Sequence, residues 1–134
     1  MAFSEKPLVK KHGLSELVFI LHVPDEVRHS GVIIVVGGPQ YRVGSHRQFV
    51  YLARFLAANG VPVLRFDYTG MGDSTGEGKN FESINEDIAI AVDAFFEQVP
   101  TMDNVILWGL CDAASASGFY AASDERIKGL VLLN

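Results

Sequence analysis

Short apolar runs of strand length alternate with amphipathic helical stretches through most of this chain, and that alternation limits its fold more than any other feature. The expected strands cover residues 17–23, 31–36, 61–66, 105–108 and 128–133. The expected helices run from about 45 or 47 to 59, from about 82 to 98 and from about 113 to 122. Because parallel strands need crossovers, which helices usually supply, this order predicts a three-layer α/β/α sandwich around a mostly parallel sheet. Residues 6–10 are expected to add an antiparallel strand.

Two of the expected helices carry an apolar stripe at helical spacing. The stripe of the second helix is Ile84, Ile88, Ala91, Val92, Phe95 and Val99. The stripe of the first helix is Phe49, Leu52, Ala53 and Leu56. Both stripes predict one buried face per helix. Ser83 and Glu86 have capping-box spacing at the start of the second helix, and Gly60 fits the end of the first.

The segment Gly109-Leu110-Cys111-Asp112-Ala113 lies between an apolar strand and a helix of small residues. This arrangement is typical of a nucleophile elbow, a sharp turn that exposes one reactive side chain. Gly109 and Ala113, two residues before and after Cys111, are small enough for the turn to close. Cys111 is the predicted nucleophile, the helix N-terminus favours its thiolate, and the Asp112 N–H is a predicted oxyanion donor. The alternative is a buried structural thiol, the usual role of a lone cysteine.

A glycine loop, Gly37-Gly38-Pro39-Gln40, follows the expected strand 31–36. In open α/β sheets the loops at the carboxyl ends of the strands form the binding crevice. Gly37 and Gly38 let the backbone turn and present N–H groups, whereas Pro39 has no N–H to donate. We therefore predict the second oxyanion donor at Gln40, with a tight turn that merely requires glycine as the alternative.

A second glycine-rich loop follows the expected strand 61–66 and contains Gly70-x-Gly72. A flavodoxin-like nucleotide-binding function is disfavoured, because no helix begins directly behind these glycines and no phosphate-loop motif is present. Asp67 and Asp73, which flank the glycines, are expected to stabilise the loop and not to take part in chemistry.

The composition excludes several classes of protein. The chain has 134 residues, 49% of them hydrophobic, which is enough for one domain with a core. Its net charge of −5 and lack of a basic cluster argue against nucleic acid as a partner. A single cysteine excludes an internal disulfide and fits the cytoplasm. We expect no secretory signal, membrane span, cofactor or metal site.

Three segments together resemble the N-terminal half of an α/β-hydrolase. The loop FDYTGMGDS is similar to the D-x-x-G-x-G-x-S loop of that superfamily. More narrowly, the chain from Leu17 to Asn134 resembles the exosortase A system-associated hydrolases of type 1. The segments that carry this resemblance are VVGGPQYRVGSHRQF, RFDYTGMGDS and LWGLCDAASAS. It implies a cytoplasmic hydrolase linked to bacterial exopolysaccharide and protein-sorting gene clusters, with Cys111 at a nucleophile position where serine is commoner.

The same resemblance implies that residues 1–134 are the N-terminal part of a single truncated α/β-hydrolase domain, without C-terminal strands or cap. The superfamily places its acid and histidine after the nucleophile, on later loops. Of the four histidines, only His46 lies near a predicted site loop, and a loop-ordering role suits it better than that of a base. The strand at 128–133 is expected to have a bare outer edge, which predicts self-association.

Two functions from different classes follow. The first is a hydrolase with Cys111 as nucleophile, acting on a small-molecule ester, thioester or lactone through an acyl-enzyme and weak or inactive as this chain. The alternative is a non-catalytic α/β binding or interaction module that keeps the hydrolase scaffold.

Overall fold

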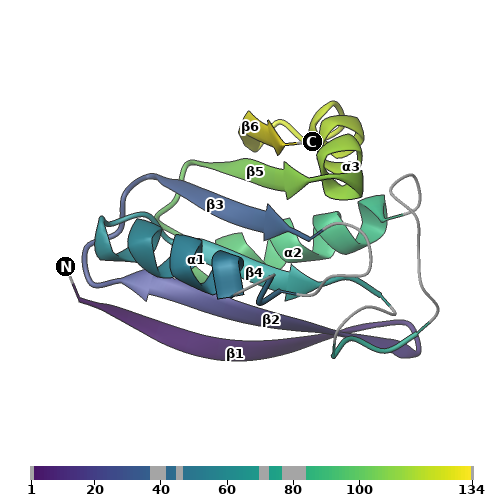
Figure 1. Ribbon diagram of the computed structural model, residues 1–134, viewed down its shortest axis with the longest axis horizontal. Coiled ribbons are helices and arrows are strands. Elements are labelled where there is room, and N and C mark those ends of the chain that lie inside the picture. Colours follow the sequence, from purple (N-terminus) through teal and green to yellow (C-terminus); the bar gives the residue numbers. More distant parts are fainter. Residues whose placement is uncertain (1, 37–41, 45–46, 70–72, 77–83, 134) are drawn as a thin grey trace.

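The computed structural model describes residues 2–36, 42–44, 47–69, 73–76 and 84–133. In this part of the chain, six strands form one sheet in the order β1-β2-β4-β3-β5-β6 (Figure 1). The strands are β1 (Phe3–His12), β2 (Ser15–Pro24), β3 (Ser30–Val35), β4 (Val63–Asp67), β5 (Asn104–Leu110) and β6 (Ile127–Leu133). The helices are α1 (Gln48–Ala58), α2 (Asn85–Gln98) and α3 (Asp112–Ala121).

The sheet is antiparallel at one side and parallel through the rest. β1 pairs with β2 and β2 with β4 in antiparallel register, whereas β3 pairs in parallel with both β4 and β5, and β5 with β6. The predicted mostly parallel α/β/α sandwich is therefore confirmed, and so is the predicted antiparallel strand at 6–10, which is part of β1. Each parallel step is made by a helical crossover, as the chain order requires.

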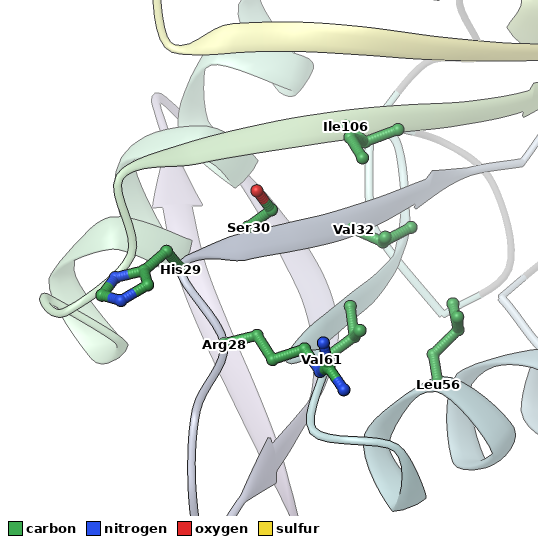
Figure 2. A pocket seen from close by; sticks show the side chains of 7 residues that line it. All are labelled: Arg28, His29, Ser30, Val32, Leu56, Val61 and Ile106. Carbon is green, nitrogen blue, oxygen red and sulfur yellow. The ribbon is translucent and has the colours of Figure 1, made fainter.

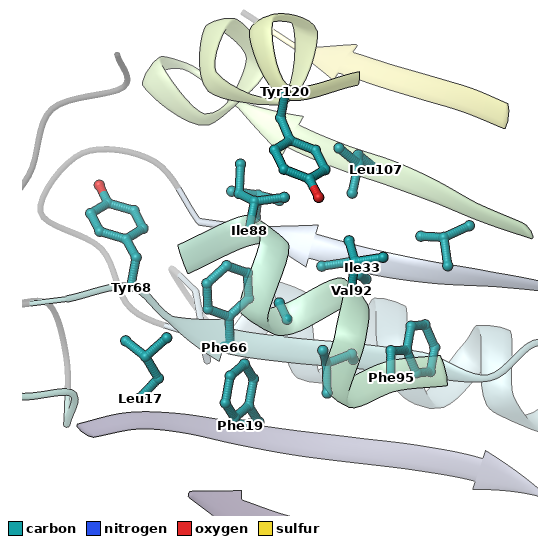
Figure 3. Close-up of a cluster of buried hydrophobic side chains, with 14 of the residues drawn as sticks. Leu17, Phe19, Ile33, Phe66, Tyr68, Ile88, Val92, Phe95, Leu107 and Tyr120 are labelled. Atoms are coloured by element: carbon teal, nitrogen blue, oxygen red, sulfur yellow. The ribbon is translucent and has the colours of Figure 1, made fainter. Parts of the chain in front are cut away.

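Helices cover the two faces of the sheet unequally. α2 and α3 pack over one face, where the larger core cluster lies, and α1 packs over the other with a smaller cluster (Figures 1 and 3). β5 shows the difference directly. Its side chains alternate between buried positions on the α2 and α3 face, such as Leu107, and half-buried positions on the α1 face, such as Trp108.

The helix stripes agree with the sequence in most positions. The whole predicted stripe of α2 is buried, from Ile84 to Val99. In α1, Phe49 and Ala53 are buried as predicted, but Leu52 and Leu56 are only half-buried and pack against the smaller core cluster from its margin.

The predicted capping box at the start of α2 is wrong. The N-cap is Ile84, without a side-chain cap, and Ser83 lies outside the described residues. The acidic residue at the third helical position is therefore Asp87, which is fully buried. Its carboxylate accepts hydrogen bonds from Thr69 N at 2.7 Å and Thr69 Oγ1 at 3.0 Å. Asp87 thus ties α2 to the loop that follows β4.

Candidate active site

The turn between β5 and α3 has the geometry of a strained elbow. Cys111 has φ 57° and ψ −123°, a backbone conformation that residues with a side chain rarely adopt. Its side chain is exposed, and α3 begins at the next residue, Asp112. Such strain costs on the order of 1–3 kcal/mol, so the surrounding structure must hold the turn in place.

Gly109 is required for this turn on steric grounds. A Cβ at position 109 would lie 2.5 Å from Ala113 O, 2.7 Å from Ala113 C and 2.9 Å from Ala114 N. All three are backbone atoms and cannot rotate away as a flexible side chain can. The predicted elbow supports Gly109 and Ala113 are therefore in contact across the turn, as their small size indicated.

Two backbone hydrogen bonds fix Cys111 from either side. Cys111 N donates to Leu133 O at 2.9 Å, and Ala114 N donates to Cys111 O, also at 2.9 Å. The first bond joins the elbow to the end of β6, the outer strand next to β5. This link was not predicted, because it depends on the pairing of two strands that only the folded sheet brings together.

The carboxyl ends of three neighbouring strands, β4, β3 and β5, lie at the same end of the sheet as the elbow. Val35 at the end of β3 pairs with Phe66 of β4 on one side and with Gly109 of β5 on the other. From these positions the chain continues into residue 36, into the segment that begins at Asp67, and into Cys111. The topology therefore places the starts of the three predicted site segments at one end of the sheet, and Gly37, Gly38 and Gln40 themselves lie outside the described residues.

Asp67 is the centre of a hydrogen-bonded cluster that joins two of these loops. Its carboxylate accepts from Arg42 N at 2.7 Å, from Arg42 Nη1 and from Asp73 N at 3.0 Å. Arg42 Nη1 also donates to Asp73 Oδ2 at 2.8 Å. Asp67 and Asp73 thus make hydrogen bonds that hold this segment, as predicted, and their partner Arg42, which was not predicted, directly follows residue 41.

None of the described histidines lies next to Cys111. His12 ends β1, four strand spacings from β5, which is roughly 19 Å at 4.8 Å per strand. His29 precedes β3 and so lies at the amino-terminal end of that strand, away from the elbow. Its Nδ1 is 3.3 Å from Asp103 Oδ2. His22 is buried within β2, and His46 lies outside the described residues. Within the described part of the chain, none of these histidines is placed to act as the base for Cys111.

His22 belongs to a buried polar network beneath α1 that the sequence did not reveal. Its Nε2 accepts from Arg65 Nε at 3.0 Å, and its Nδ1 lies 2.9 Å from Glu5 Oε2. Arg54 of α1 donates to both Glu5 oxygens, at 2.8 and 3.0 Å. Arg65 Nη1 donates to Arg42 O at 2.9 Å, which connects this network to the Asp67 cluster. Burial and the adjacent Arg65 charge lower the pKa of His22 to about 4.

The stability of the protein should fall as the pH drops from about 6.5 to about 4. In this window the unfolded chain protonates His22, whose ordinary pKa is about 6.5, while the folded chain keeps it neutral. Stability is therefore complete above pH 6.5 and is lost towards pH 4, by about 3 kcal/mol at about 1.4 kcal/mol per pKa unit. Urea unfolding at a series of pH values measures this slope. His22→Gln should flatten it between pH 5 and 6.5; an unchanged slope in the variant would assign the dependence to other groups.

One cavity lies away from the elbow, and a second begins at the residue that follows the elbow segment. One of about 520 Å³ is lined by Arg28, His29, Ser30, Val32, Leu56, Val61 and Ile106 (Figure 2). It lies on the α1 face, towards the amino end of β3, and so at the opposite end of that strand from the site loops. The other, of about 450 Å³, lies between α3 and β6 and is lined by Ala114, Ser115, Gly118, Phe119 and Leu132. Among the described residues, no three His, Cys, Asp or Glu side chains are grouped to hold a metal ion.

Several solved structures share this architecture. The esterase Pf2001 of Pyrococcus furiosus is 19% identical with a TM-score of 0.81, and the match covers 95% of this chain and 50% of that one. The α/β hydrolase GrgF of a Penicillium species is 23% identical with a TM-score of 0.78, covering 97% of this chain and 45% of that one. A thermostable carboxyl esterase of Bacillus coagulans is 21% identical with a TM-score of 0.77, covering 98% and 44%.

The chain has the α/β-hydrolase fold. It spans about half the length of the hydrolases named above. No protein-family model and no curated protein matches the sequence. No helix in the described residues is long and apolar enough to cross a membrane.

Proposed function

We propose that this chain carries the nucleophile of a hydrolase that attacks an ester, thioester or lactone through Cys111. The observation that supports this most strongly is the backbone of Cys111, held at φ 57° and ψ −123° with its side chain exposed. A buried structural thiol needs neither the strain nor the exposure. Strained residues concentrate at functional sites because the surrounding fold maintains them at a cost.

The proposed chemistry begins with attack of the Cys111 thiolate on the substrate carbonyl carbon. A C–S bond forms, and the carbonyl oxygen becomes an oxyanion that accepts hydrogen bonds from the Asp112 N–H and from the Gln40 N–H, with Gly37 and Gly38 supporting that segment. Collapse of this intermediate breaks the bond to the leaving group, which takes a proton from solvent, and leaves an acyl-thioester on Cys111. Water then releases the acid and regenerates the thiol.

The second half of this reaction needs a base to activate water. His12, His22 and His29 are all held elsewhere in the sheet, as described above. The acyl-enzyme should therefore accumulate on this chain, and turnover should be slow. We infer that residues 1–134 act as the nucleophile-bearing part of one hydrolase domain, in the cytoplasm, and the exosortase-associated type remains the narrower form of this proposal.

Treatment of the purified chain with p-nitrophenyl acetate tests the proposal. One acetyl group should be transferred to Cys111, seen by intact mass and peptide mapping, with one burst of p-nitrophenol and little turnover afterwards. Cys111→Ala should abolish the transfer. Ser115→Ala, which removes an exposed hydroxyl one turn further along α3, should leave it unchanged.

Two outcomes would contradict this proposal. Rapid turnover that Cys111→Ser abolishes would show that a base is present after all. Acetylation no faster than in the urea-unfolded chain would instead favour the alternative, a non-catalytic binding module on a hydrolase scaffold. The observation that favours this alternative is that the described histidines all lie away from the elbow.

A further inference from the structure

Arg42 is the residue at which the two polar clusters meet, and three of its groups are held by other side chains. Its backbone N–H donates to Asp67 Oδ1 at 2.7 Å, and its guanidinium donates to the carboxylates of Asp67 and Asp73. Its carbonyl oxygen accepts from Arg65 Nη1 at 2.9 Å. The chain is therefore fixed in place and in direction immediately after residue 41.

Arg65 holds that carbonyl from inside the protein. It is only 5% exposed, and its Nε donates to His22 Nε2 at 3.0 Å while its Nη1 donates to Arg42 O. The guanidinium is a planar fork of donors with fixed geometry, so a bond at Nε sets the direction of the bond at Nη1. Both acceptors are uncharged, although a buried charge is usually paired with an opposite one. Charge neutralisation does not account for this arrangement, whereas the placing of the Arg42 carbonyl does.

His22 and Glu5 orient Arg65 in turn. Because His22 Nε2 accepts from Arg65, the neutral ring carries its proton on Nδ1. That nitrogen lies 2.9 Å from Glu5 Oε2, and the two residues are cross-strand partners in β2 and β1. Arg54 of α1 donates to both oxygens of Glu5 and fixes the outer end of this line. The line of polar groups thus runs across β1, β2 and β4 and ends on the backbone of the segment that follows β3.

A polar network of this kind can also serve stability alone. Buried ionic groups, however, often add little net stability compared with apolar residues of similar size. The last bond of this line is made to a carbonyl outside the strands, so it adds nothing to the pairing of the sheet. It acts instead on the chain that leaves β3 at the same end of the sheet as the elbow.

We propose that Arg65 is a positioning residue for the attack by Cys111, acting through the Arg42 carbonyl. Gln40, the proposed oxyanion donor, precedes Arg42 by two residues and itself lies outside the described part of the chain. Two residues span at most about 7 Å, so an anchor at Arg42 limits how far that donor moves. A donor stabilises the oxyanion only when it lies within hydrogen-bond distance of it. This role rests on the function proposed above, because it acts on the oxyanion and not on the thiol.

Two reactions of Cys111 separate stabilisation of the oxyanion from reactivity of the thiolate. Acetylation by p-nitrophenyl acetate forms a C–S bond through an oxyanion and releases p-nitrophenolate. With methyl methanethiosulfonate, the thiolate instead attacks sulfur, an S–S bond forms and methanesulfinate departs, with no carbonyl involved. The ratio of the two rate constants therefore reports the oxyanion donors, whereas the thiolate fraction and the exposure of Cys111 affect both reactions.

Arg65→Met should lower the ratio of acetylation to methylthiolation by about tenfold or more. Loss of a whole oxyanion donor costs on the order of 10²–10³-fold, and a donor that has lost its anchor keeps part of its effect. His22→Leu removes the acceptor that orients Arg65 and should lower the ratio in the same direction, which keeps the test open if Arg65→Met folds poorly. The Arg42 amide hydrogen should also exchange faster with solvent in both variants.

Arg126→Met is the matched control. Arg126 also donates to carboxylates, those of Asp93 and Asp124, and its carbonyl accepts from Val105 N at the amino end of β5, opposite the elbow. Its loss should cost stability and leave the ratio of the two rate constants unchanged. Circular dichroism checks that each variant folds.

The results distinguish a failure of this role from a failure of the proposed function. Acetylation of the unaltered chain no faster than that of the urea-unfolded chain overturns both. Rapid acetylation of the unaltered chain, with the same ratio in Arg65→Met and His22→Leu, overturns the positioning role alone. Equal slowing of both reactions in these variants, or an equal fall of the ratio in Arg126→Met, overturns it as well, because the effect would then be a general loss of structure.

Discussion

Gly109→Ala should lower the free energy of unfolding by about 3 kcal/mol, the upper part of the range for overpacked sites. The new methyl group would meet Ala113 O at 2.5 Å, a backbone atom at the start of α3. Relief of the clash requires α3 to move away from β5, which releases the strained backbone of Cys111. We therefore expect slower acetylation or alkylation of Cys111 together with the loss of stability, measured by urea unfolding and by mass spectrometry on the same samples.

Gly118→Ala supplies a matched control for this prediction. It makes the same chemical change in α3, the helix that follows the elbow, but a Cβ at position 118 meets nothing within 4 Å. Alanine is favoured over glycine inside a helix by about 1 kcal/mol, so this variant should be slightly more stable. Equal effects of the two substitutions would show that the elbow does not depend on the close approach of Gly109 to Ala113.

Asp67→Ala should cost about 3–5 kcal/mol of unfolding free energy, the usual effect of breaking a buried ion pair. The Asp67 side chain is fully buried and the Arg42 side chain is only 16% exposed. Removal of the carboxylate leaves the Arg42 charge without its buried partner and takes the acceptor from the backbone N–H groups of Arg42 and Asp73. Urea unfolding measures the loss.

Asp73→Ala separates the buried member of this cluster from the exposed one. The Asp73 carboxylate also pairs with Arg42, but it is 64% exposed. Exposed pairs contribute about 0–1 kcal/mol, so this variant should unfold close to the unaltered protein. If both substitutions destabilise the chain equally, then the cluster works through its charges as a group and the burial of Asp67 is not decisive.

The order of strands and helices was predictable because it depends on local patterns. The stripe of α2 repeats at helical spacing, and the apolar run of β3 has strand length, so both elements were located from their own residues. The boundary of α2 was less predictable. Ile84 forms the N-cap although Ser83 has the better capping side chain, because Ile84 is fully buried in the core and Asp87 is bonded to Thr69.

Most of the polar contacts in the structure could not be predicted from the sequence. Nothing local marks His22 as buried, since it follows an apolar strand pattern in which a histidine could face solvent equally well. Its burial follows from its position in β2 beneath α1, between Glu5 and Arg65. Arg42 likewise hydrogen-bonds to Asp67 only because the ends of β3 and β4 are neighbours in the sheet.

The amino-acid sequence by itself determined the succession of elements and the elbow at Cys111. A turn of five residues, with Gly109 and Ala113 on either side, depends on steric contacts within one short segment, and those contacts are readable from residue size. Only the tertiary structure decided which strand ends lie beside that elbow and which residue bonds the Cys111 N–H. Those features depend on the pairing of β3 with both β4 and β5, and of β5 with β6, between segments far apart in sequence. Strand order is set by the burial of the whole sheet, and no single segment carries that information.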